Sequence, residues 1–191
     1  MMQEVVQEIE NTVMDVMKGI HTAMPGTISS FDPGSGKATV KPGGKYTSSS
    51  GKRIAYPQIS DVPVAFPVCQ SAGVGVACPV KAGDSCIIII SEVELDEWRS
   101  GAESEGALQF DLSSAMAVPG LLVGGSEMIQ KACDQDAVVI VSGTAEVLVS
   151  EEKITASIGD TEFTLTEEGM AIRGNLRVDG DISYTGSLQG G

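Results

Sequence analysis

The sequence predicts a mainly β protein with an N-terminal helix, a small barrel and a C-terminal array of repeated strands. Three observations support this fold class. Apolar residues recur at helical spacing over residues 1–23, short extended runs broken by Gly and Pro follow, and a two-residue alternation extends from Ala137 to Tyr184. We therefore expect three parts: an amphipathic helix at 1–23, a barrel domain at 24–125 and a repetitive β segment at 126–191.

The first part has the spacing of an amphipathic helix. Its apolar residues lie mostly three or four positions apart, at Val5, Val6, Ile9, Val13, Met17 and Ile20. Acidic residues occupy the other face, and Met24-Pro25-Gly26 discourages continuation of the helix. Membrane-surface helices favour Lys and Arg, whereas this segment has only Lys18. We therefore expect the apolar stripe to pack on its own domain or on a symmetry mate.

Residues 27–90 predict several short strands joined by turns, a pattern typical of a small barrel. Thr27–Phe31 and Lys37–Lys41 form a hairpin across the turn Asp32–Gly36. Further strands are expected at Ile59–Phe66 and Cys86–Ile90.

The end of this region combines a buried strand with a short helix. Because Ile87–Ile90 is continuously apolar, we expect a strand that is buried on both faces. Ser91, with an acid three positions later at Glu94, predicts a helix start, and Gly101 ends that helix.

The C-terminal part is a crude structural repeat. Seven or eight short strands are separated by turns, with roughly eight to ten residues between successive strands. Each strand offers two or three apolar side chains on one face, which is too little for this segment to offset its chain entropy alone. It therefore needs partner chains, whose number the alternation does not give. The expected inward residues include Ile154, Ile158, Phe163, Leu165, Ile172, Leu176 and Val178.

The charge and the cysteine content argue against several classes of protein. A formal net charge of -14, from 26 acidic and 12 basic residues, argues against a nucleic-acid partner, because phosphate binding depends on Lys and Arg. The four cysteines, Cys69, Cys78, Cys86 and Cys133, have no metal-binding spacing, and we expect buried, reduced thiols in a protein assembled in the cytoplasm. We expect neither a membrane span nor a secretion signal, because no run of about 18 apolar residues occurs and the N-terminus is acidic.

Few residues are candidates for catalysis or ligand binding. Lys45–Arg53, with Tyr46, is the one basic cluster; it is either a phosphate-gripping loop or, as we favour, a solvated one. Pro79–Asp84 is a turn that lacks the glycine pattern of a phosphate cradle. With one histidine, His21, and carboxylate pairs expected only at turns, such as Glu151-Glu152 and Glu167-Glu168, the sequence predicts no catalytic residue, cofactor site or metal site.

Six short motifs then occur in a specific order. They are Met24–Ile28 with Phe31-Asp32, Ala38–Pro42, Ile59–Pro67, Cys78–Asp84, Asp96–Trp98, and Phe110–Ala115 with Val118–Leu121. In this order, over about residues 24–122, the chain resembles the baseplate central spike proteins of contractile phage tails, which begin with an oligonucleotide/oligosaccharide-binding (OB) barrel.

The resemblance implies a non-enzymatic homotrimer. Its barrels would sit on the baseplate hub below the tail tube, and three C-terminal segments would intertwine into a β-helical needle that punctures the host cell envelope when the sheath contracts. It places the protein in the virion, or in a headless phage-tail-like particle, after assembly in the bacterial cytoplasm.

One departure concerns the tip of such a needle. Many spikes of this kind hold an iron ion there through a His-x-His pair, whereas the one histidine here lies near the N-terminus, so a histidine-ligated tip metal is excluded. Asp179 and Asp181 have the chemistry to ligate a hard cation, although Asp-Gly-Asp is more commonly a turn. Three forms of the tip stay open: a blunt end, a glycine-capped end, or an end completed by a separate small protein.

Two other functions stay open. An OB barrel is also a common carbohydrate- or nucleic-acid-binding module, although the acidic charge and the scarcity of aromatic residues speak against it here. A tail-associated muralytic enzyme is the less favoured alternative, because no nucleophile and base are set in a recognisable frame.

Overall fold

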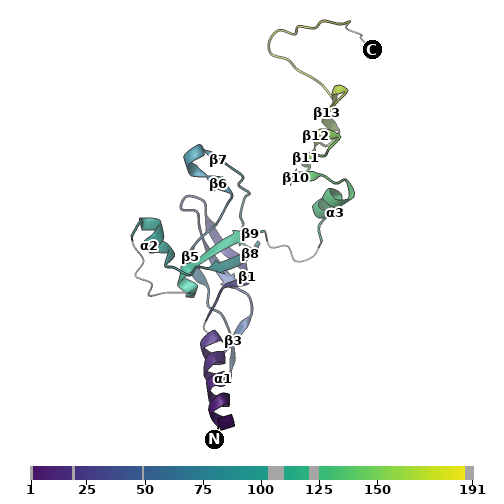
Figure 1. Ribbon diagram of the computed structural model, residues 1–191. Coiled ribbons are helices and arrows are strands. Elements are labelled where there is room, and N and C mark those ends of the chain that lie inside the picture. The colour runs from purple at the N-terminus through teal and green to yellow at the C-terminus, as the bar shows by residue number, and fades with distance from the viewer. Residues whose placement is uncertain (1, 19, 49, 103–109, 121–124, 188–191) are drawn as a thin grey trace. The chain divides into compact units, whose positions relative to one another are not determined.

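The computed structural model describes residues 2–18, 20–48, 50–102, 110–120 and 125–187. The chain divides into two compact units, which we call unit 1 (Met1–Leu122) and unit 2 (Val123–Gly191). Figure 1 shows the helices and strands of each unit along the chain.

Unit 1 begins with the predicted amphipathic helix, α1 (Met2–Lys18). The helix is shorter than expected, since it ends at Lys18 and not near Ala23. Met24-Pro25-Gly26 does not act as the helix stop, because it lies inside the first strand, β1 (Ala23–Asp32). Pro25 and Gly26 pair there with Ile87 and Cys86. A β-carbon at position 26 would lie 2.5 Å from the Ile88 Cδ1 atom, so the glycine permits close approach to the neighbouring strand.

The main sheet of unit 1 has five antiparallel strands in the order β5-β2-β1-β8-β9. The other four strands are β2 (Lys37–Pro42), β5 (Ile59–Pro63), β8 (Ser85–Ile90) and β9 (Ala115–Pro119). The sheet curls so that the residues after β5 approach β9: Val64 forms an isolated parallel bridge with Ala117, and the Ala65 N–H donates to the Ala117 carbonyl at 2.8 Å. The predicted mainly β fold with an N-terminal helix is confirmed, and the observed sheet is a curled half-barrel.

The core of unit 1 fills the inner face of this sheet. It consists of Ile28, Ala38, Val40, Val62, Cys86, Ile88, Ile90, Ala115 and Ala117. The expectation that Ile87–Ile90 is buried on both faces is wrong: Ile88 and Ile90 are buried, but Ile89 is 36% exposed. The half-barrel has only one packed face, so β8 alternates between inside and outside like its neighbours.

The basic Lys45–Arg53 segment is a hairpin rather than an open loop. β3 (Lys45–Thr47) pairs with β4 (Arg53–Ala55), with Tyr46 opposite Ile54. A second small hairpin joins β6 (Val68–Cys69) to β7 (Val74–Gly75) through the 3-10 turn η1 (Gln70–Ala72).

The short helix after β8 starts later than predicted. α2 (Leu95–Ser100) begins after Glu94, whose side chain makes no cap, while the Ser91 hydroxyl accepts a hydrogen bond from the Val93 N–H at 3.1 Å instead. The predicted end at Gly101 is confirmed by its left-handed backbone, with φ of 77°. The 3-10 turn η2 (Leu112–Ser114) then leads into β9.

Unit 2 consists of one helix and one sheet in its described residues, 125–187. The helix, α3 (Glu127–Asp134), was not predicted from the sequence; the Ser126 hydroxyl caps it by accepting from the Ile129 N–H at 3.2 Å. Five antiparallel strands follow as a meander in chain order. They are β10 (Val138–Ser142), β11 (Ala145–Val149), β12 (Lys153–Ile158), β13 (Thr161–Thr166) and β14 (Gly169–Arg173).

The sequence predicted more strands than the chain forms. Residues 174–187, all of them described, contain no strand, so the expected seven or eight strands reduce to five. The predicted boundary between residues 125 and 126 lies beside residues 121–124, which are outside the described residues.

All four cysteines are described and free, but only Cys86 is buried, so the expectation of four buried thiols is wrong for Cys69, Cys78 and Cys133. Burial raises the pKa of the Cys86 thiol. No helix in the described segments has the length and apolar character to cross a bilayer.

Candidate assembly surface

The strand register of unit 2 gathers its apolar side chains on one face of the sheet. Side chains alternate between faces along each strand, and directly paired residues share a face. One row across the sheet is Ile140, Val147, Ala156, Phe163 and Ile172, and the next is Val138, Val149, Ile154, Leu165 and Met170. We call these ten residues, with Ala145 and Ile158, the apolar face.

The apolar face is uncovered. Val138, Ile140, Ile158 and Met170 are each 63–64% exposed. By contrast, Leu148 on the other side of the sheet is 2% exposed and is the one buried apolar residue in the described part of unit 2. Soluble monomers rarely expose a contiguous apolar surface that spans five strands, and such a surface marks an interaction site.

The opposite face of the sheet is polar and partly covered by α3. The Lys131 ammonium contacts both carboxylate oxygens of Glu146 at 2.5 Å, which ties the helix to β11. Beyond the helix, this face presents Thr155, Ser157 and Glu162. The two faces of the described sheet therefore differ in chemistry: one is mostly polar, and the other is apolar except for Ser142 and Thr161, which pair with Ala145 and Ile158.

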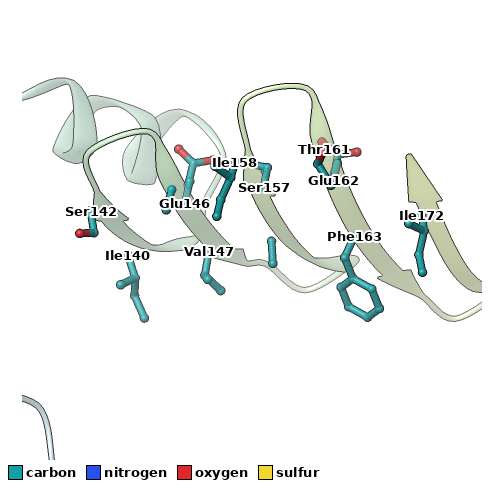
Figure 2. Close-up of a pocket in the computed structure, with 12 residues that line it drawn as sticks. Ile140, Ser142, Glu146, Val147, Ser157, Ile158, Thr161, Glu162, Phe163 and Ile172 are labelled. Carbon is teal, nitrogen blue, oxygen red and sulfur yellow. The ribbon is translucent and has the colours of Figure 1, made fainter. Parts of the chain in front are cut away.

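A groove of about 390 Å³ runs along the row of the apolar face that begins at Ile140 and ends at Ile172. Figure 2 shows Ile140, Val147, Phe163 and Ile172 extending from the same side of neighbouring strands. Hydroxyls and carboxylates lie at the margin of the groove, at Ser142, Thr161 and Glu162. An apolar trough of this kind can receive apolar side chains.

Most of the inward residues predicted from the sequence lie on the apolar face. Ile154, Ile158, Phe163, Leu165 and Ile172 all share it. Leu176 and Val178 lie beyond the last strand instead and are 66% and 44% exposed. Sequence reasoning did not single out Val138 and Ile140, because Ala137–Val141 is apolar at every position and hides the alternation.

Unit 1 carries a second cleft, which is aromatic. Tyr56 packs against His21 with ring centroids 5.5 Å apart and against Tyr46 at 5.3 Å. These rings line an open cleft of about 1010 Å³ together with Asp15 and Lys45. The structure thus brings Lys45 and Tyr46 of the basic segment next to the one histidine.

The remaining chemical candidates do not converge. No group of three or more His, Cys, Asp or Glu residues suited to a metal occurs in the described segments. Asp179 pairs with the exposed Arg177 guanidinium at 3.1 Å. Glu151-Glu152 and Glu167-Glu168 lie exposed on the turns between strands, where the sequence placed them.

Comparison with known proteins identifies the class of this chain and then its family. The class is that of phage structural proteins with a tail-associated role, and the evidence for it comes from unit 1. Residues 24–120, the half-barrel domain, match the family described as the phage protein Gp138 N-terminal domain. The match covers just over half of the chain, and the chain belongs to this family. A search of curated proteins returned no match.

Proposed function

We propose that this protein is the central spike of a contractile phage tail or of a phage-tail-like particle, and that it punctures the host cell envelope during sheath contraction. The observation that carries the proposal is the uncovered apolar face of unit 2, attached to a phage-family domain. On this proposal, unit 2 is one third of a needle and unit 1 is its mount.

Association with other copies of this chain would bury the apolar face. Around a threefold axis, three sheets turn their apolar faces inward, so that each side chain packs against two symmetry-related copies. Burying a Val, Ile, Leu, Phe or Met side chain fully contributes about 1.5–3 kcal/mol, and ten of the twelve residues of the apolar face are of these types. The number of three chains comes from the resemblance to phage spikes, because an apolar face alone does not determine how many chains assemble.

Strand edges give a second reason for assembly. In the described sheet of unit 2, β10 and β14 are the outermost strands, each hydrogen-bonded to one neighbour only. Open edges are prone to unwanted pairing. In the proposed needle, the edges of one chain pair with those of the next, and the three segments intertwine into a continuous rod.

Unit 1 mounts the needle on the baseplate hub, below the tail tube. The order β5-β2-β1-β8-β9, with the parallel contact between Val64 and Ala117, supports closure of the half-barrel into an OB-type barrel. The spike works mechanically, because continuous hydrogen bonds and a shared apolar core make the rod resist buckling. On this proposal it needs neither a cofactor nor an active site.

The oligomeric state tests this proposal directly. Light scattering of the purified full chain should give three times the chain mass of 19.8 kDa, and a monomer would overturn the needle. Phe163→Asp, on the apolar face, should abolish the trimer. Thr166→Asp, on the opposite face and paired with Lys153, is the matched control and should leave it intact. In isolated particles, antibodies against the protein should label the baseplate end of the tail.

The aromatic cleft of unit 1 favours a second candidate function, carbohydrate binding. Tyr46 and Tyr56 offer aromatic rings on whose faces a sugar can stack, and Lys45 and Asp15 line the same cleft. A glycan array on the full chain tests this candidate, with Tyr56→Ala as the variant that should remove any signal. Single-stranded DNA should not bind even at low salt, because the chain is strongly acidic.

A further inference from the structure

The N-terminal helix α1 carries a heptad repeat along one side. Val6, Ile9, Val13 and Val16 are separated by three, four and three positions, so Val6 and Val13 occupy a positions while Ile9 and Val16 occupy d positions. Met2 and Ile20 continue the same spacing in the sequence. Both neighbouring frames are poorer, because one places Glu10 in the seam and the other places Thr12 and Gly19 there.

The seam of α1 is exposed along its whole length. Val6 and Val13 are each 50% exposed, Ile9 is 58% exposed and Val16 is 64% exposed. Every side chain from Gln3 to Met17 is exposed, including those on the apolar side. A helix of 17 residues is marginal in water without tertiary packing, so this seam needs a partner.

We propose that α1 forms a parallel three-stranded coiled coil with the α1 helices of two other copies of this chain. The seam residues themselves argue for three strands. Parallel dimers combine β-branched residues at a with Leu at d, whereas β-branched residues at both positions shift the preference to higher states. In α1, the four seam positions from Val6 to Val16 are all Val or Ile, and Met2 precedes them at a d position.

The flanking positions agree with this arrangement. Val5 at g and Met17 at e widen the apolar seam on both sides, as a third strand requires. In a parallel coil, g of one helix meets e of the next, which pairs Val5 with Glu10 and Thr12 with Met17 and brings no like charges together. Glu4, Glu8 and Asp15 fall at outward positions.

The coil depends on the trimer, so this inference rests on the proposed function. At under three heptads, α1 is too short to associate strongly by itself. Three chains already joined through unit 2 hold their helices at a millimolar-scale effective concentration, which makes helix association intramolecular. A threefold axis also points all three helices in the same direction, as a parallel coil requires.

Hydrogen–deuterium exchange on the full chain tests the coil. In the wild-type trimer, amides of α1 should exchange at least about tenfold more slowly than after Ile9→Asn, which places a polar group in the seam. Met14→Asn is the matched control, since Met14 is as exposed as Ile9, at 58%, but lies at an outward b position. It should leave the protection of α1 unchanged.

The outcomes separate this inference from the proposed function. If light scattering gives a trimer but wild-type α1 exchanges as fast as the Ile9→Asn variant, the coil is wrong and the needle stands. Equal effects of Ile9→Asn and Met14→Asn would also overturn the coil. If the chain is a monomer, the needle fails first and the coil with it.

Discussion

The apolar face of unit 2 makes a quantitative prediction at Ile140. This side chain is 63% exposed in the single chain, and full burial of an Ile contributes about 1.5–3 kcal/mol. Assembly that covers the remaining 63% therefore adds about 1–2 kcal/mol per chain, or about 3–6 kcal/mol per trimer. Ile140→Ala should remove most of this contribution. The assay is equilibrium denaturation of the full chain at several protein concentrations, followed by light scattering and circular dichroism.

Val141→Ala is the control that makes this result specific. Val141 is the next residue of β10, lies on the opposite face, and is 43% exposed. Its truncation should change the stability of the trimer by no more than about 0.5 kcal/mol per chain. If Ile140→Ala and Val141→Ala have the same effect, or if neither depends on protein concentration, then the apolar face is not an assembly surface and the reasoning fails.

Three further predictions concern unit 1. Gly26→Ala should destabilise the unit by about 1–3 kcal/mol in thermal or chemical unfolding, because the added carbon meets Ile88, whereas Gly34→Ala in the β1–β2 turn should be close to neutral. Hydrogen bonds from Ser113 lower the pKa of Asp111, so its stabilising effect is present above the ordinary value of 3.8 and is lost as pH falls through the lowered pKa; the unfolding free energy of Asp111→Asn should therefore lack part of the wild-type decline below about pH 4. Buried Cys86 should react with a thiol reagent only on unfolding, whereas Cys69, Cys78 and Cys133 should react in the native protein unless assembly covers them.

The alternation in unit 2 could be read from the sequence because it needs no knowledge of strand pairing. A period of two places Ile154 and Ile158 on one face of β12, and Phe163 and Leu165 on one face of β13, whichever strand lies beside them. The same rule cannot assign side chains to a face in Ala137–Val141, because every residue there is apolar. Only the register of β10 against β11 assigns those side chains to a face.

Two features of unit 1 were misjudged for related reasons. The run Ile87–Ile90 is apolar on both sides, but its burial depends on how many layers the sheet has, which is a property of the whole unit. The half-barrel packs one side, so Ile88 is buried and Ile89 is not. The polar composition of Lys45–Arg53 indicated a loop, whereas the backbone pairs into a hairpin that brings Tyr46 to Tyr56.

The segment after β14 shows what a single chain lacks. Its apolar residues keep the two-residue spacing at Leu176 and Val178 and again at Ile182 and Tyr184, yet residues 174–187 contain no strand. These four side chains are 44–67% exposed. A strand forms when its backbone groups find a paired edge and its apolar side finds a surface, and alternation provides neither.

In the proposed trimer, strand edges of the other two chains are available to this segment. We therefore expect residues 175–184 to become ordered strand only in the assembled needle. Their amides should be protected from hydrogen exchange in the wild-type trimer and unprotected in the Phe163→Asp variant, which cannot assemble. Unit 1 provides the internal reference, because its core of nine buried residues is complete within one chain and its protection should be the same in both proteins. Fast exchange of residues 175–184 in a confirmed trimer would show that the needle ends at β14.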